Sequence, residues 1–116
     1  MTRHDFRGAV EKRRSNTFIH RETDVMRQGV PATLLEIQAD QVVVVTEEEF
    51  IVGENVKLEL SNLLQRFKTN VRGQVESADE QRNEYRLALS LTTRLNPHEV
   101  LTLRMQIRSD VRQQWF

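Results

Sequence analysis

Two stretches decide the fold that this sequence predicts: Thr69-Asn70-Val71-Arg72-Gly73-Gln74-Val75-Glu76 and, a little later, Tyr85-Arg86-Leu87-Ala88-Leu89-Ser90-Leu91. Each alternates apolar or small residues with polar ones, which places one row of side chains against a core and the other in water. Between them, residues 77–84 hold seven polar positions out of eight, which is typical of an exposed loop. The pattern predicts a long β-hairpin, with Gly73 at a bulge or at a close approach by another backbone.

The rest of the chain must supply strands for this hairpin, because a two-stranded hairpin is only marginally stable on its own. The clearest signal is the run Val42-Val43-Val44-Val45 within a predicted strand over 41–46. A run that is apolar on both faces predicts a barrel wall covered by a helix or by a partner subunit. Further strands are predicted over 17–21, 32–38 and 56–60, with turns at 38–41 and 52–55 and a solvated loop at 47–49.

A helix is predicted over 97–112. Asn96 is a favoured N-cap, Pro97 suits the first helical position, and Glu99 completes a capping box. An apolar face follows at helical spacing, whereas the arginines of the other face are expected to be solvated or to contact a partner. The apolar residues are Val100, Leu103, Ile107 and Val111, and the arginines are Arg104, Arg108 and Arg112. The terminal Trp115 and Phe116 are expected to dock on their own domain or at an oligomer contact.

The chain has 116 residues and is expected to form one domain with one modest core. We predict a mainly β protein, a six-stranded antiparallel β-barrel with a C-terminal α-helix over 17–116, preceded by a basic N-terminal arm over 1–16. The absence of cysteine excludes disulfides and thiolate metal sites. The sequence has neither a run of transmembrane length nor the apolar core of a signal peptide, so a cytoplasmic protein without membrane insertion is expected.

Charge is unevenly distributed although the net charge is zero. Residues 1–27 carry seven basic and four acidic side chains, residues 36–59 carry one and seven, and residues 60–116 carry nine and six. The acidic middle argues against nucleic acid as a partner, because nucleic-acid binding needs a continuous basic surface. The basic N-terminal segment is expected either to meet one small anion or to pair with the acidic segment.

Catalytic and metal-binding patterns are absent from the sequence. The histidines His4, His20 and His98 fall in three different elements, and none has a neighbouring ligand at metal spacing. There is no Gly-x-Ser-x-Gly motif, and the four glycines are too dispersed for a phosphate-binding loop. We therefore predict a protein that is not an enzyme and that holds no metal and no cofactor.

The strand pattern resembles that of a PilZ domain over residues 10 to 108. The resemblance rests on Gly53-x-x-Val56-x-Leu58-x-Leu60, on Val71-x-Gly73-x-Val75, on Tyr85-Arg86-Leu87-Ala88-Leu89-x-Leu91, and on the helix begun by Asn96-Pro97. PilZ domains are bacterial six-stranded barrels, many of which bind the second messenger cyclic diguanylate. The resemblance implies a signalling or adaptor module with this nucleotide as its candidate ligand.

Nucleotide binding in that family depends on two motifs, and both are altered here. The first is Arg-x-x-x-Arg in the N-terminal arm, whose planar guanidinium groups suit phosphates and guanine edges. Arg14, beside Arg13, best fits its separation from the second motif, with Val10 at the partner position. Arg3 and Arg7 form a literal copy that lies farther upstream.

The second motif, Asp/Asn-x-Ser-x-x-Gly, is replaced at all three key positions by Glu36, Gln38 and Gln41. These longer side chains would fill the space that a guanine needs. Each lost charge-assisted hydrogen bond costs about 1.5–3 kcal/mol, or about one to two orders of magnitude in affinity. If the resemblance extends to the ligand, the candidate binding residues are Arg13, Arg14, Arg3, Arg7, Glu36 and Gln38.

The leading hypothesis is therefore a bacterial PilZ-like module that acts by binding. Retained binding of cyclic diguanylate would use the N-terminal arginines, whereas a degenerate barrel would bind no nucleotide and would act through a protein partner or as a homo-oligomer. We favour the degenerate alternative. A small RNA-binding β-barrel would need a basic surface interleaved with exposed aromatic residues. An enzyme would need a pocket that holds two titratable groups with perturbed pKa values.

Overall fold

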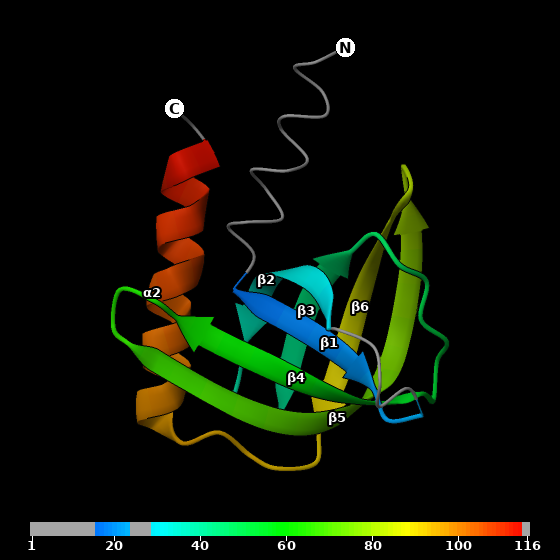
Figure 1. Cartoon of the computed structure of the whole chain (residues 1–116), viewed down its shortest axis with the longest axis horizontal. Coiled ribbons are helices and arrows are strands. Elements are labelled where there is room, and N and C mark those ends of the chain that lie inside the picture. The colour runs from blue at the N-terminus through cyan, green and yellow to red at the C-terminus, as the bar shows by residue number, and fades with distance from the viewer. Residues whose placement is uncertain (1–15, 24–28, 115–116) are drawn as a thin grey trace.

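The computed structural model describes residues 16–23 and 29–114, with their side chains up to residue 107. The fold is mainly β: six antiparallel strands form a closed barrel in the order β1-β2-β3-β6-β5-β4, and one C-terminal helix, α2, follows (Figure 1). This confirms the predicted fold class. The elements are β1 (Thr17–Arg21), β2 (Val30–Ile37), β3 (Gln41–Thr46), β4 (Asn55–Asn62), β5 (Phe67–Gln81), β6 (Glu84–Leu91) and α2 (Pro97–Gln114).

Alternate residues of each strand fill the barrel. In β4, for example, Val56, Leu58 and Leu60 have no exposed surface, while the residues between them are partly exposed. Full burial of such a side chain stabilises the fold by about 1.5–3 kcal/mol. The alternation therefore sets which face of each strand points inward, because a slip of one residue would turn every apolar side chain into solvent.

Helix α2 closes one end of the barrel, where β2 and β4 finish. Val100 and Leu103 enter the core, and Asn62 at the end of β4 donates its side-chain amide to the carbonyl of Thr102 at 2.8 Å. The predicted capping box is confirmed: the Asn96 side chain accepts from the N–H of Glu99 at 2.8 Å, and the Glu99 carboxylate accepts from the N–H of Asn96 at 3.0 Å. The predicted contacts of Val111, Arg108, Arg112, Trp115 and Phe116 lie outside the described side chains.

The predicted loop at 77–84 is wrong, because both strands of the hairpin continue through this segment. The connection consists only of Arg82 and Asn83, both with positive φ (49° and 67°), which is the backbone of a two-residue hairpin turn. β5 runs past its last partner in β4, Gln74, and its side chains there are mostly exposed. Polar residues are compatible with a strand whose two faces both meet water, and for this reason their composition was misleading.

Gly73 marks a close approach between strands, which was one of the two predicted explanations. A Cβ atom at this position would lie 2.7 Å from the backbone oxygen of Ser90 in β6. The bulge of β5 lies elsewhere, between Val75 and Ser77. Gly73 pairs with Val56 of β4 on one side and with Leu91 of β6 on the other, so no side chain fits where β5 bends between its two partners.

We predict that Gly73→Ala lowers the free energy of unfolding by about 1–3 kcal/mol, because the added methyl group must displace backbone rather than a flexible side chain. Urea unfolding followed by circular dichroism measures this change. Ser77→Ala, on the exposed part of the same strand, is the control and should stay within about 0.5 kcal/mol of the wild type. Equal stability of the two variants would contradict the steric explanation.

Candidate functional site

Glu36, one of the two sequence-predicted site residues that the structure describes, lies on the outer face of the barrel near the end of β2. A bulge between Leu34 and Glu36 shifts the register of β2, and Glu36 then stands directly opposite Val43 of β3. Its carboxylate lies 3.8 Å from the guanidinium of Arg86, on β6. We call the outward faces of β2, β3 and β6 the outer wall.

The ion pair between Glu36 and Arg86 spans β3 on this outer wall. Glu36 is opposite Val43, and Arg86 is opposite Val45, the next outward residue of β3. The two charged side chains therefore reach across the valines, and Val43 is only 9% exposed although it faces outward. The prediction that the valine run is buried on both faces is thus confirmed for Val42, Val43 and Val44. The predicted cover by a helix or a partner subunit stays a prediction.

Gln38, the second described candidate, lies in the tight turn between β2 and β3, as the sequence predicts. Its N–H donates to the carbonyl of Gln41 at 2.8 Å. The carbonyls of Ala39 and Asp40 accept from Leu95 and Leu91, at 2.8 Å each, which fixes the turn against the segment that leads into α2. The Gln38 side chain is exposed at this end of the outer wall. The other candidates, Arg3, Arg7, Arg13 and Arg14, lie outside the described residues.

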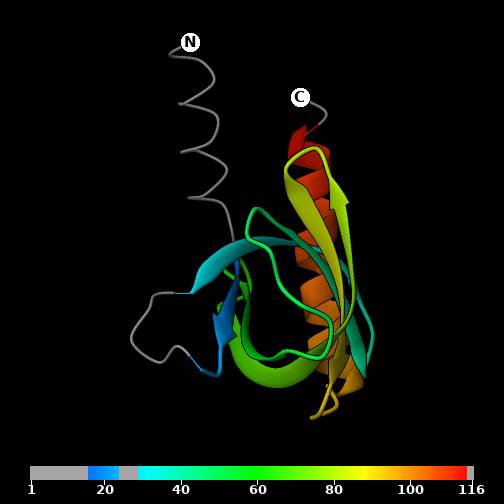
Figure 2. The same ribbon diagram turned by 90° about the vertical axis from the view of Figure 1, so that its right-hand side faces the viewer.

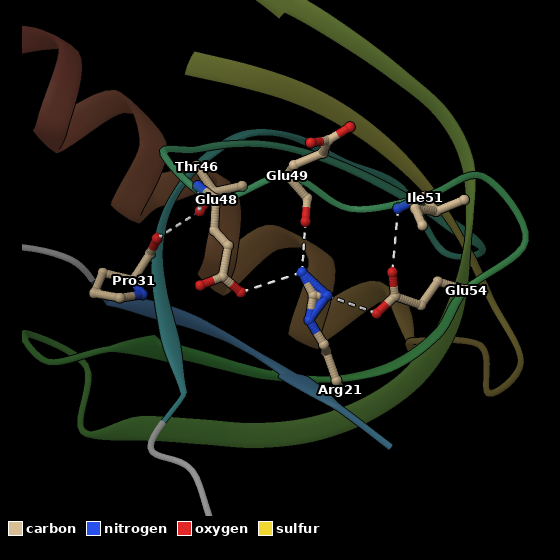
Figure 3. Close-up of polar contacts among 7 residues, drawn as sticks. All are labelled: Arg21, Pro31, Thr46, Glu48, Glu49, Ile51 and Glu54. Atoms are coloured by element: carbon tan, nitrogen blue, oxygen red, sulfur yellow. Dashed lines mark hydrogen bonds and ion pairs between the residues drawn. The ribbon is translucent and has the colours of Figure 1, made fainter. Parts of the chain in front are cut away.

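Arg21 is a residue whose role the sequence analysis missed. It is the last residue of β1, and its guanidinium lies 4.1 Å from the ring centroid of Phe50, which is 2% exposed. As Figure 3 shows, the same guanidinium contacts the carboxylates of Glu48 at 3.2 Å and Glu54 at 2.8 Å, and donates to the carbonyl of Glu49. We call Arg21, Glu48, Glu54 and Phe50 the mouth cluster, because it lies at the barrel end opposite α2.

The mouth cluster holds the segment between β3 and β4 across the barrel end (Figures 2 and 3). Residues 47–49 were predicted as a solvated charge run, and Glu47 and Glu49 do have exposed side chains. Glu48 is only partly exposed because it faces Arg21. A cation over an aromatic ring and between two carboxylates is a stable arrangement, since the ring and both acids favour the same positive charge. The sequence gives no local signal for it, because Arg21 is far from its partners along the chain.

A second polar group lies on the outer face of β1, β4 and β5. Glu59 contacts the ring of His20 at 2.9 Å through one carboxylate oxygen and the ammonium of Lys68 at 3.4 Å through the other. The hydrogen bond with His20 is the largest influence and lowers the pKa of Glu59, with a further contribution from Lys68, whereas partial burial acts in the opposite direction. His20 also packs closely against Gly29, where a Cβ atom would lie 2.7 Å from the ring.

No protein-family model matches the chain, and no curated protein shows significant sequence similarity to it. Among the described side chains, no group of three histidines, cysteines or carboxylates is placed to hold a metal ion. No helix in the described part of the chain combines the length and apolar character needed to cross a membrane.

We predict that Arg21→Met lowers the free energy of unfolding by about 1.5–3 kcal/mol, because it removes charge-assisted hydrogen bonds to the loop while keeping an apolar stem over Phe50. Chemical denaturation at low and high salt measures the loss. Arg94→Met, at an exposed position, is the control and should change stability by less than about 0.5 kcal/mol. A loss no larger than that of the control would show that the mouth cluster does not hold the loop.

The lowered pKa of Glu59 predicts a pH-dependent contribution to stability. A carboxylate whose pKa is depressed by folding stabilises the protein above its ordinary value of 4.5, and this contribution disappears as the pH falls through the folded value. Glu59→Gln should therefore be less stable than the wild type at about pH 7, and the difference should shrink as the pH falls below 4.5. Urea unfolding across this range tests it, with the exposed Glu84→Gln as control. A difference that is constant with pH would contradict the assignment.

Proposed function

We propose that this chain is a non-catalytic, PilZ-like adaptor module that acts through protein contacts and does not depend on cyclic diguanylate. The closed six-stranded antiparallel barrel with a helix after the last strand supports the resemblance to PilZ domains, although a barrel of this kind also serves other functions. The choice between a nucleotide receptor and a protein adaptor depends on the residues of the outer wall.

The observation that carries the proposal is what stands at the positions of the second motif, Asp/Asn-x-Ser-x-x-Gly. Glu36 is engaged with Arg86 across Val43, so a guanine approaching here would meet an ion pair instead of a short polar acceptor. Such an exposed pair is worth only about 0–1 kcal/mol, so its rupture alone would not prevent binding. The stronger obstacle is steric. Gln41 stands at the position of the motif's glycine and its φ is not positive, so a guanine approaching here would meet an additional side chain.

Exposed apolar side chains support a role in protein contacts. Ile51 and Val52 lie in the loop of the barrel mouth, Leu63 and Leu64 in the turn between β4 and β5, and Leu101 and Met105 on the outward side of α2. The four leucine and isoleucine side chains among them are 59–79% exposed. Pairs of exposed apolar side chains such as these are suited to contacts with another protein.

Calorimetric titration of cyclic diguanylate into the full chain tests the proposal. We expect no binding heat at about 100 µM ligand, because several charge-assisted contacts of the second motif are lost together. The double variant Arg13→Ala/Arg14→Ala should behave like the wild type. Binding at micromolar concentration that disappears in this double variant, but not in the control Arg94→Ala, would make the protein a nucleotide receptor and overturn the proposal.

A further inference from the structure

The free edge of β5 is the first feature that points to a particular kind of partner. β4 pairs with β5 up to Gln74, and the loop between β3 and β4 continues this pairing as far as Val75 of β5. The N–H of Val75 donates to Glu54 at 3.0 Å, and the carbonyl of Val75 accepts from Gly53 at 2.8 Å. Beyond Val75, no strand among the described residues pairs with this side of β5, although β5 continues to Gln81. We call residues 76–81 of β5 the ribbon edge. The hairpin of β5 and β6, which carries this edge, projects from the barrel (Figures 1 and 2).

An unpaired strand edge offers backbone N–H and C=O groups to an added strand. The two-residue turn closes on Gln81 and Glu84, so these two residues exchange hydrogen bonds within the hairpin. Because bonding alternates along an antiparallel pair, the backbone groups of Glu80 point away from β6 and towards the free side. The ribbon edge therefore has the geometry for pairing with an extended segment.

Two apolar side chains stand where the ribbon edge begins. Ile51 and Val52 are 70% and 59% exposed, and the next residue, Gly53, pairs with Val75 of β5 next to the start of the edge. Their turn is well fixed: the N–H of Glu54 donates to the carbonyl of Ile51 at 3.0 Å, and Gly53 has the positive φ of 95° that this turn requires. A preformed apolar turn beside an unpaired strand favours binding, because little conformational entropy is lost.

The charges around the ribbon edge select the partner. Residues 76–84 contain four acidic side chains, Glu76, Asp79, Glu80 and Glu84, and one basic side chain, Arg82. Glu49, in the loop between β3 and β4, adds to this negative charge. The pKa of Tyr85 is raised above its ordinary value of 10.0, first by partial burial and then by the charges of Glu80 and Glu49. Edge-to-edge pairing with a second copy would bring acidic side chains against acidic side chains, which is unfavourable.

We propose that the ribbon edge, together with the apolar turn at Ile51 and Val52, binds an extended, basic segment of a partner protein by β-strand addition. The backbone of β5 provides the pairing, the apolar turn provides a contact for an alternate side chain of the partner, and the acidic residues select lysine and arginine. This inference rests on the proposed function as a protein adaptor and names the class of partner that the adaptor takes.

The test uses the full chain and a fluorescent synthetic peptide in which lysine alternates with valine and threonine. We expect saturable binding by fluorescence anisotropy that weakens as salt is raised, because the charged groups are exposed. The same peptide with glutamate in place of lysine should not bind. Failure of the basic peptide to bind at about millimolar protein, or equal binding of the acidic peptide, would overturn the proposal.

Three variants separate backbone pairing, charge and apolar contact. Glu80→Pro removes an outward N–H and should weaken binding by about tenfold or more, whereas Glu80→Gln removes only the charge and should weaken it by about two- to fivefold. The double change Ile51→Ser/Val52→Ser should weaken binding by about tenfold. Thr92→Ala/Thr93→Ala, at two exposed positions after the end of β6, is the control and should bind as the wild type does.

Each variant is first compared with the wild type by circular dichroism and thermal unfolding, so that a change in binding is read only from folded protein. Wild-type affinity in both Glu80→Pro and the serine pair at positions 51 and 52 would overturn the proposal. The outcome is distinguishable from that of the proposed function. Binding of cyclic diguanylate would overturn the adaptor reading whatever the peptide does. If neither the basic peptide nor cyclic diguanylate binds, the ribbon edge is rejected as the docking surface, and the proposed adaptor function is not affected.

Discussion

The pairing of β1 with β4 is the constraint on which the rest of the structure depends, because it closes the sheet into a barrel. β1 has only five residues, yet it pairs with β4 along its whole length and with β2 over its first three residues. Without this ladder the sheet would have two free edges and an open core. The inward side chains Thr17 and Ile19 are nearly or fully buried, so packing and backbone pairing stabilise the closure together.

Closure of the sheet leaves two barrel ends, and they are covered by different physical means. At one end, α2 inserts apolar side chains and the Asn62 amide bonds to the helix backbone. At the other end, Arg21 lies over the buried ring of Phe50 and holds the short acidic loop to which this phenylalanine belongs. The first arrangement depends mainly on buried apolar area, and the second on electrostatic interactions near the surface. The two ends therefore differ in their expected sensitivity to salt.

The position of the charges gives the outside of the barrel distinct regions. On the outer wall, Glu36 and Arg86 neutralise each other over Val43, which leaves little field to attract an anionic ligand. Around the free edge of β5 the acidic side chains outnumber the basic ones, and exposed apolar groups lie beside them. A surface that combines unpaired backbone, exposed apolar side chains and one sign of charge is suited to a polypeptide, and for this reason we propose partner recognition there and not on the outer wall.

The sequence by itself determined the features that depend on local alternation and capping. It gave the bounds of β1 and β3, the inward faces of β4 and β6, and the start of α2 with its capping box, and it singled out Gly73 as the place of a bulge or of a close approach. Only the tertiary structure decided the length of the hairpin, because a strand exposed on both faces has no apolar period. It also decided the roles of Arg21 and Glu36. Their partners, Glu54 and Arg86, lie far along the chain and become neighbours only when the sheet closes.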